Sequence, residues 1–246
     1  MTSTSQHIAL DIIQPCYNPL PDWEKSVWLH FQEVQKLLPD VNIKLIIVND
    51  GSIKNVSENQ IEYLKARINN FEYINSSPNH GKGFALRKGV EASKGTFQIY
   101  TDIDFPFELI HIKEIYEMLK NNNTDIVSGI RSKNYYSTLS PQRLLASKMS
   151  QILNQLFLKL PFNDTQSGIK GFNRKGRMIF LRTTIDRYLA DTEFLALAAK
   201  SGKLKIIPHE VSLRDDIVLS KMNFSTFLLE LKNFFTVYSI IFRTKA

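Results

Sequence analysis

The stretch IKLIIVNDGS (residues 43–52) runs almost without interruption through apolar side chains before it reaches a polar turn. A strand that is apolar on both faces is typical of parallel sheets, in which helices cover the two sides. Asn49, Asp50 and Gly51 are turn-forming residues and close the run. The stretch therefore predicts a strand of a helix-covered parallel sheet, with Asp50 at its carboxyl end.

The segments on either side of this strand repeat the same alternation. Short apolar runs predict further strands, and segments with apolar residues at helical spacing separate them. The predicted strands are residues 8–13, 43–48, 71–76, 96–100 and 125–130, and the predicted helices are 23–38, 57–68, 82–93 and 108–120. This order predicts an α/β/α sandwich with a mainly parallel central sheet.

The pattern changes after residue 131. The sequence predicts a long helix over 141–160, a short strand after DTQSGIKGF (164–172), a helix over 193–201, a strand over 203–213 and a final helix over 223–242. No internal repeat or linker divides the chain, so residues 1–246 are expected to form a single domain.

Composition limits the class of partner. The chain has 31 Lys+Arg against 24 Asp+Glu, a formal charge of +7, which favours an anionic partner such as a phosphorylated ligand or an acidic membrane surface. No nucleic acid partner is expected, because zinc-finger, RNA-binding and dense basic patterns are missing from the sequence. One cysteine permits no internal disulfide. The sequence has no recognisable signal peptide and no run of the ~18 apolar residues that a membrane span needs, which predicts a soluble or peripheral protein.

Four polar clusters follow the first four predicted strands: PCYN (15–18), NDGS (49–52), NHGKG (79–83) and TDID (101–104). Ligands of parallel α/β sheets bind outside the carboxyl ends of the strands. The four loops are therefore expected to form one site.

Two of these loops have chemistry of their own. Asp102 and Asp104 offer carboxylates suited to Mg²⁺ or Mn²⁺, although acids there would also cap the helix that follows. In NHGKG, Lys82 and two glycines precede a predicted helix, an arrangement that favours phosphate but also fits a plain solvated turn.

Together the motifs are more specific than any one alone. PCYNP, VNDGS, NHGKGFALRKGVEASKG, TDID and DTEF occur in the order and at the spacing of family 2 inverting glycosyltransferases, which have the GT-A fold, over most of residues 8–215. The segments DTQSGIKGF and VSLRDDIVLSK resemble the polyprenol-phosphate branch, which includes the dolichyl-phosphate mannose and glucose synthases. The resemblance implies a metal-dependent hexosyltransferase of cell-envelope biogenesis that moves a sugar from a UDP- or GDP-sugar to a polyprenyl or dolichyl phosphate.

The resemblance also implies roles for particular residues. The nucleotide sugar would bind in the half formed by residues 8–130 and the acceptor in residues 131–246. Donor-binding residues would be Pro15, Tyr17, Asn18, Asp50, Lys82, Gly83, Asp102 and Lys221, with Arg214 as a further candidate beside Lys221. Metal ligands would be Asp102 and Asp104, and acceptor-phosphate residues would be Arg131, Arg143, Ser147 and Gln166. Catalytic residues would be Asp191, Glu193 and Asp164, with Asp191 preferred for contact with the reacting end.

The sequence departs from the family's pattern at two single positions, and the Trp or Tyr often found near Ser212–Arg214 is also missing. Asn49 stands where an acid is frequent, and Pro106 stands where polyprenol-phosphate enzymes often have a glutamine. A further metal ligand at position 106 is therefore not expected, and the sugar and base of the donor stay open.

The predicted helices 141–160 and 223–242 have apolar stripes with nearby Lys or Arg. Such stripes ordinarily pack on a core. The alternative is a helix that lies on an anionic leaflet, which would suit a protein of the cytoplasm held peripherally on the cytoplasmic face of a membrane. The sequence does not predict an oligomeric state.

Three other functions compete with lipid-phosphate transfer. They are transfer to a glycan hydroxyl in cell-surface polysaccharide synthesis, sugar nucleotidyl transfer, and non-catalytic binding of a nucleotide sugar. The loop PCYNP argues against a nucleotidyltransferase, which would be expected to have a Gly-rich, basic loop after its first strand.

Overall fold

The computed structural model describes residues 9–121, 123–132, 147–148, 151, 154, 162, 164–217 and 239. Within these residues seven strands form one sheet in the order β3-β2-β1-β4-β6-β5-β7. The strands are β1 (Leu10–Cys16), β2 (Ile43–Asp50), β3 (Phe71–Ser76), β4 (Phe97–Tyr100), β5 (Ile126–Arg131), β6 (Lys170–Phe172) and β7 (Ile206–Val211). The helices are α1 (Trp23–Leu37), α2 (Glu58–Lys65), α3 (Lys82–Ala92), α4 (Ile110–Lys120), α7 (Arg174–Phe180) and α8 (Ala190–Ser201).

The sheet is mainly parallel, which confirms the predicted fold class. Strand β1 pairs in parallel with β2 and β4, β2 with β3, and β5 with β7. Strand β6 is antiparallel to both of its neighbours, β4 and β5. It therefore enters the sheet from the opposite direction and brings residues 164–169 to the edge where β4 ends.

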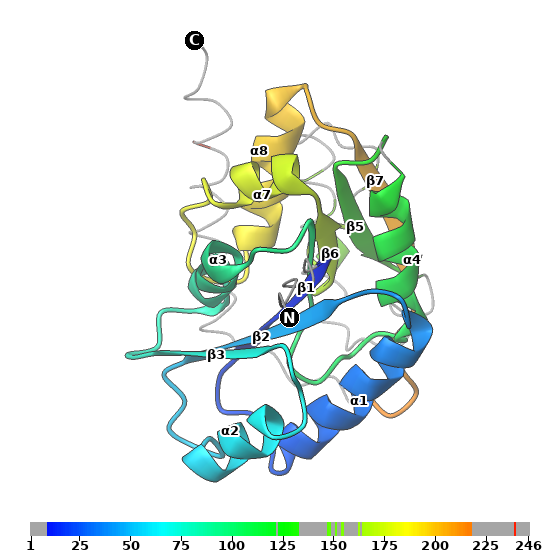
Figure 1. Cartoon of the computed structure of the whole chain (residues 1–246). Helices are drawn as coiled ribbons and strands as arrows, with labels where there is room; N and C mark the ends of the chain where they lie inside the picture. The colour runs from blue at the N-terminus through cyan, green and yellow to red at the C-terminus, as the bar shows by residue number, and fades with distance from the viewer. Residues whose placement is uncertain are drawn as a thin grey trace, which may run out of the picture.

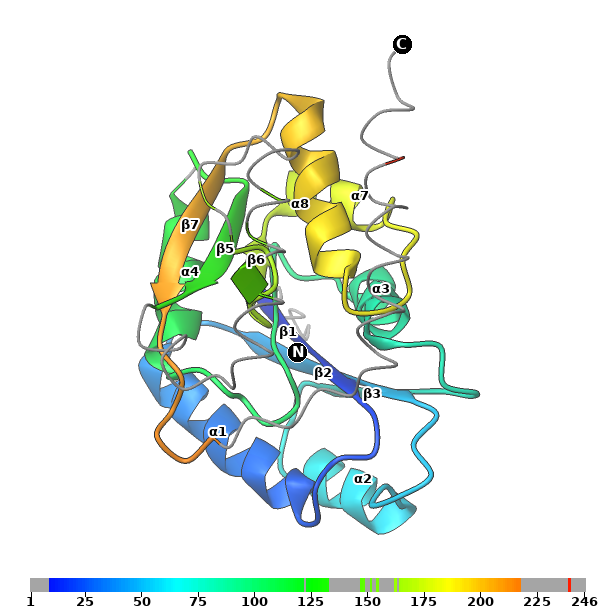
Figure 2. The same ribbon diagram turned by 180° about the vertical axis from the view of Figure 1, so that it is seen from behind.

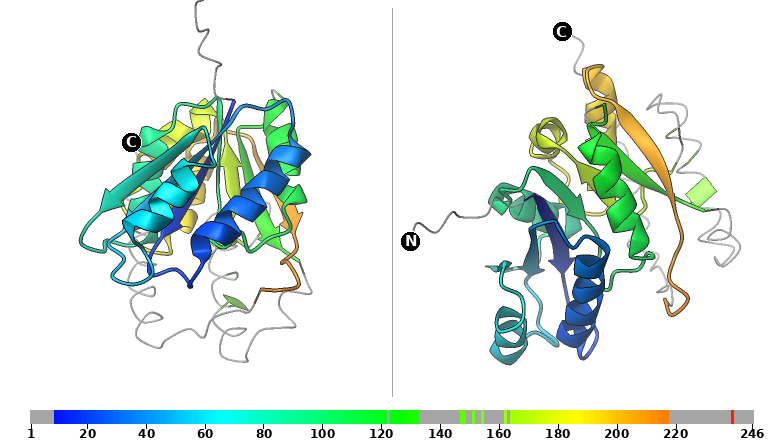
Figure 3. Two further views of the ribbon diagram at one scale, coloured as in Figure 1. Left: turned by 60° about the horizontal axis from the view of Figure 1, so that its bottom comes forward. Right: turned by 45° about the vertical axis from the view of Figure 1, so that its right-hand side comes forward.

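Helices cover both faces of the sheet (Figures 1 and 2). Helices α1, α2 and α4 share one apolar core, in which Leu45 and Ile47 of β2 are buried. Helices α3, α7 and α8 share the other, with Ile46 and Val48 of β2. Alternate residues of a strand point to opposite faces, so the unbroken apolar run in β2 serves both cores. Figure 3 shows the two helical layers from two further sides.

Among the residues that the structure describes, one helix was missed by the sequence analysis. Helix α7 begins after Asn173, whose side-chain oxygen accepts hydrogen bonds from Lys175 N at 2.9 Å and Gly176 N at 3.2 Å. Asparagine is a favourable N-cap, so a signal for this helix was present in the sequence. Helix α8 begins at Ala190, before the predicted start at residue 193, which places Asp191 and Glu193 in its first turn.

The predicted helices over 141–160 and 223–242 lie outside the described residues apart from isolated positions. Arg143 and Lys221 lie outside them as well. No helix in the described part of the chain is both long enough and apolar enough to cross a membrane.

Candidate active site at the carboxyl edge of the sheet

The loops after β1 and β2 are joined through Asn18. Its side-chain oxygen accepts hydrogen bonds from Ile53 N at 2.9 Å and Lys54 N at 3.1 Å, and its own N–H donates to Ser52 Oγ at 2.9 Å. Asn18 has a φ of 46°, a left-handed conformation that asparagine tolerates better than most residues. Asn18 therefore holds two of the four predicted loops in contact, and the neighbouring ring of Tyr17 is exposed beside them.

Asp50 joins the loop after β2 to the loop after β3. Its carboxylate accepts hydrogen bonds from Asn79 Nδ2 at 2.7 Å, His80 N at 2.9 Å and Gly81 N at 2.6 Å, and the residue is 2% exposed. Three charge-assisted hydrogen bonds give a short loop a fixed shape. The described contacts of Asp50 are thus to the NHGKG loop, and its predicted role in donor binding stays a prediction.

Lys82 and Asp102 form an ion pair between the start of α3 and the end of β4. Burial opposes the charge on Lys82, but the carboxylates of Asp102 and Asp191 outweigh it and raise the lysine pKa above its ordinary value. The backbone of Asp102 is also fixed, because its carbonyl accepts hydrogen bonds from Gln14 Nε2 and Phe105 N, both at 3.0 Å. Two of the predicted donor-binding residues therefore touch each other in a defined place.

Asp102 and Asp104 are the candidate metal ligands. Partial shielding from water raises the pKa of Asp104 above its ordinary value. Repulsion by the negative charge of Asp102 raises this pKa further. A divalent cation relieves such repulsion, and Mg²⁺ or Mn²⁺ takes one or two carboxylates with phosphate and water as its remaining ligands. These two residues therefore fit a divalent cation. Pro106 offers only its carbonyl, which accepts a hydrogen bond from Arg214 N at 3.0 Å.

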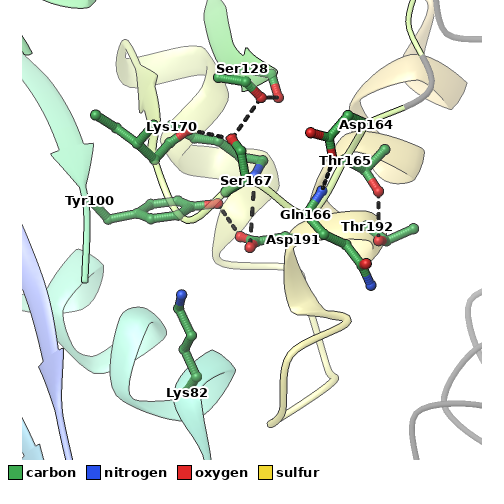
Figure 4. Close-up of polar contacts among 12 residues, drawn as sticks. Lys82, Tyr100, Ser128, Asp164, Thr165, Gln166, Ser167, Lys170, Asp191 and Thr192 are labelled. Atoms are coloured by element: carbon green, nitrogen blue, oxygen red, sulfur yellow. Dashed lines mark hydrogen bonds and ion pairs between the residues drawn. The ribbon is translucent and has the colours of Figure 1, made fainter. Parts of the chain in front are cut away.

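Asp191 lies opposite Lys82 in a buried polar cluster, which Figure 4 shows with the side chains drawn as sticks. The Tyr100 hydroxyl donates a hydrogen bond to one oxygen of Asp191. Lys170 Nζ lies 3.7 Å from the other oxygen and donates to Ser167 O at 2.7 Å. Asp191 is therefore held from β4 and from β6 at once, with Lys82 pointing toward the same cluster.

Tyr100 and Lys170 were missed by the sequence analysis. Both are completely buried, and burial lowers the pKa of Lys170 although Asp191 opposes the shift. A lysine within the otherwise apolar segment SGIKGF was the available signal, because a buried charge needs a partner.

Glu193 has a different environment from its neighbour Asp191. Its two carboxylate oxygens accept hydrogen bonds from Thr184 N at 2.9 and 2.8 Å, Thr184 Oγ1 at 2.8 Å and Ile185 N at 2.8 Å, and the residue is 1% exposed. This arrangement holds the 184–185 turn against α8. The contacts of Glu193 are those of a residue that shapes the site, and its catalytic role stays a prediction.

Asp164 and Arg131 pair with each other. Arg131 Nε and Nη2 donate to the two oxygens of Asp164 at 2.7 and 2.6 Å, and Arg131 N adds a third hydrogen bond at 2.8 Å. Burial opposes the charge of Asp164, but these bonds hold its pKa below the ordinary value. A predicted acceptor residue and a predicted catalytic residue thus form one buried pair at the ends of β5 and the 164–169 loop.

The remaining predicted residues have varied surroundings. Gln166 lies beside Asp164, to which its N–H donates at 3.2 Å. The Ser147 hydroxyl is buried and has no hydrogen-bond partner among the residues described. Pro15 is half-buried in β1. Gly83 packs so tightly that a Cβ added to it would lie 2.3 Å from Ile185 O, so its glycine is explained by helix packing.

Comparison with known proteins assigns this arrangement to a family. Residues 11–177 match the model of glycosyl transferase family 2, and the chain belongs to that family. The predicted family is thereby confirmed, on the part of the chain that contains the four strand-end loops and the buried cluster up to Lys170.

The chain is similar to two curated proteins and to one solved structure. The chain is 30% identical over 213 residues to dolichyl-phosphate beta-glucosyltransferase ALG5A of Trichomonas vaginalis, covering 82% of this chain and 65% of the relative. It is 28% identical to dolichyl-phosphate beta-glucosyltransferase of Dictyostelium discoideum, covering 79% of this chain and 63% of that one. The chain therefore spans somewhat less than two thirds of the length of these relatives.

The solved structure is that of glucosyl-3-phosphoglycerate synthase from Mycobacterium tuberculosis, in complex with Mn²⁺, uridine diphosphate and glucosyl-3-phosphoglycerate. It superposes with a TM-score of 0.60 at 13% identity and covers 95% of this chain and 79% of that one. At this identity the similarity shows the fold, and the GT-A prediction is confirmed.

Proposed function

We propose that the chain is a metal-dependent inverting hexosyltransferase that moves a sugar from a UDP- or GDP-sugar to a polyprenyl or dolichyl phosphate. The observation that carries the proposal is the meeting of Asp102, Lys82 and Asp191 at the carboxyl edge of the sheet. The names of the curated relatives supply the acceptor class.

The donor half of the site would bind the nucleotide diphosphate. Asn18 and Asp50 give the loops a fixed shape, and the exposed ring of Tyr17 is available to a base. Lys82, at the start of α3, offers both its ammonium group and a helix N-terminus to phosphate. Asp102 and Asp104 would hold Mg²⁺ or Mn²⁺, which stabilises the charge of the leaving nucleotide.

Asp191 would contact the reacting groups of the substrates, where the sugar meets the acceptor. A lipid phosphate is already ionised at neutral pH and needs no strong base, so the task of Asp191 is to orient the sugar or the acceptor. Tyr100 and Lys170 hold its carboxylate in one position for that task. With a hydroxyl acceptor the same carboxylate would have to remove a proton.

The acceptor phosphate would bind near the Arg131–Asp164 pair, with Arg143, Ser147 and Gln166 as further candidates. Guanidinium groups bind phosphate oxygens through paired hydrogen bonds. We place the acceptor in the half after residue 131, and the protein on the cytoplasmic face of a membrane, where a lipid phosphate is reached from the water phase.

A screen for nucleotide release tests this function. The full-length chain is incubated with UDP- and GDP-sugars and Mn²⁺, with and without a short polyprenyl phosphate, and released nucleotide is measured. We expect release from one donor, strongly increased by the lipid. Asp104→Asn should lower it by more than the roughly 10–100-fold that follows loss of an outer-shell metal partner.

The matched control is Glu108→Gln, which removes an exposed acid four residues away on the same segment. It should release nucleotide like the unmodified protein. Release that needs a glycan and ignores the lipid would assign the hydroxyl-acceptor alternative. Unchanged turnover in Asp104→Asn would refute the metal assignment, and nucleotide binding without release from any donor would indicate a non-catalytic binder.

A further inference from the structure

Three metal-ligating side chains meet away from the candidate active site, between α4 and the edge strand β7. His111 Nδ1 lies 2.8 Å from Glu114 Oε2 and 3.1 Å from His209 Nε2, and the latter two atoms are 3.0 Å apart. Among the described residues this is the one group of three or more His, Cys, Asp or Glu whose ligand atoms converge in this way. None of its members contacts the Asp102, Lys82 and Asp191 cluster through a described bond.

The three atoms form a triangle of nearly equal sides. Around a tetrahedral Zn²⁺ with ligands at ~2.0–2.1 Å, neighbouring donor atoms lie about 3.3–3.4 Å apart. The sides of the triangle therefore need to lengthen by only about 0.2–0.6 Å to seat such an ion. Glu114 keeps 44% of its side chain exposed, so the fourth position would face water.

We propose that His111, Glu114 and His209 bind a transition-metal dication of the Zn²⁺ type. Two imidazole nitrogens favour Zn²⁺, Co²⁺ or Ni²⁺, whereas Mg²⁺ prefers oxygen donors alone. This site is chemically distinct from the Asp102 and Asp104 pair, whose carboxylates suit the harder ions.

The second nitrogen of His111 gives the site a measurable signature. Ser212 N–H donates to His111 Nε2 at 3.1 Å, which places the ring proton on Nδ1 in the metal-free protein. A metal on Nδ1 requires that proton to move to Nε2, where Ser212 Oγ lies 3.1 Å away as an acceptor. The hydrogen bond from Ser212 N–H to Nε2 is then lost. Metal binding therefore reverses the tautomer of His111 without a net loss of protons.

The bound ion would link β7 to α4, the helix that follows the TDID loop in the chain. Strand β7 pairs with β5 alone among the described strands, so it is an edge strand on this side. The residues that follow it already join the segment after Asp104, through Glu108 N to Ser212 O at 3.0 Å and Arg214 N to Pro106 O at 3.0 Å. A metal that binds only the folded arrangement stabilises it.

Titration of the full-length protein with Zn²⁺ tests the site, with Mg²⁺ in millimolar excess to occupy hard-ligand positions. Calorimetry should give one Zn²⁺ per chain and a higher melting temperature. Glu114→Gln and the double variant His111→Ala/His209→Ala should each weaken binding by at least the roughly 10–100-fold that outer-shell changes cost. Glu117→Gln, one turn further along α4, is the control and should bind like the unmodified protein.

Two spectroscopic measurements keep the test independent of folding in the variants. Co²⁺ in place of Zn²⁺ should give visible d–d absorption in the unmodified protein, and nitrogen chemical shifts of the His111 ring should show the proton moving from Nδ1 to Nε2. If Zn²⁺ leaves the His111 tautomer unchanged, or binds the folded Glu114→Gln and double variants as tightly as the control, the proposal is wrong. The three side chains are then a hydrogen-bonded cluster in which both rings donate to Glu114.

Discussion

At the scale of single residues, the candidate site depends on charges that are held by buried partners. Asp191 receives the Tyr100 hydroxyl on one oxygen and lies 3.7 Å from Lys170 Nζ on the other. Asp164 is bound by Arg131 through both carboxylate oxygens. Buried charges of this kind are costly to leave without a partner, so each pair fixes the direction in which a candidate catalytic carboxylate points.

Tyr100→Phe removes one of the two supports of Asp191 and adds no bulk. We expect kcat to fall about tenfold with little change in the KM for the nucleotide sugar, because the donor loops are untouched. The free energy of unfolding should fall by about 1.5–3 kcal/mol, the typical value of one hydrogen bond to a charged group. Steady-state kinetics and urea unfolding measure the two effects, and Tyr116→Phe, on the other helical layer, serves as the control. An increased KM at unchanged kcat would contradict a positioning role.

Arg131→Met leaves Asp164 buried without its partner, which should cost about 3 kcal/mol of stability at pH 7. The folded-state pKa of Asp164 lies below its ordinary value of 3.8, so its pair contributes fully above that pH. This contribution is lost as the pH falls through the lower folded-state pKa. Urea unfolding at pH 7 and near pH 3 should therefore show a smaller difference between the two proteins in acid. An equal difference at both values would contradict the ion-pair account.

At the scale of elements, strand ends and helix starts bring the site together. Helix α3 starts with Lys82, and its Gly83 lies against the 185–190 turn, where an added Cβ would be 2.6 Å from Ala190 Cβ. Because Glu193 holds the same turn, α3 and α8 are fixed relative to each other. The distance between Lys82 and Asp191 thus depends on the packing of two helices that are far apart in the sequence.

Gly83→Ala tests that packing. The extra methyl group has backbone atoms beside it, so we expect a loss of about 1–3 kcal/mol, as for other overpacked sites. A raised KM for the nucleotide sugar should accompany it, because Lys82 would shift. Glu91→Ala on the exposed side of α3 is the control, and thermal or urea unfolding of the two variants gives the comparison. Equal stability of both variants would show that the helix can move away at no cost.

The sequence was sufficient for the elements whose pattern is local. The apolar run of β2 predicted a strand buried on both faces, and its residues pack in both cores. The boundaries of β3 agree with the prediction at residues 71–76. The antiparallel direction of β6 was not predictable, because three residues, Lys170–Phe172, contain no periodicity. The Asp102 and Lys82 motifs were visible in the sequence, whereas the Tyr100–Asp191 and Arg131–Asp164 pairs depend on contacts between distant segments.

At the scale of the whole molecule, two parts of the chain contribute residues to one edge of the sheet. The first four strands present the loops that would bind the donor, and the antiparallel β6 brings Lys170 and the 164–169 loop to the same edge from the opposite direction. On the proposed function, a donor and an acceptor would approach one cluster from two halves of the chain. The net charge of +7 suits the two anionic substrates that we propose.

The most direct test is mass spectrometry of the lipid after incubation with a nucleotide sugar, Mn²⁺ and a short polyprenyl phosphate. The account predicts a polyprenyl phosphate heavier by one hexosyl residue, and none from Asp104→Asn. Proton NMR of the isolated product should show the anomeric configuration inverted relative to the donor. An unmodified lipid in the presence of a donor that the protein demonstrably cleaves would contradict it.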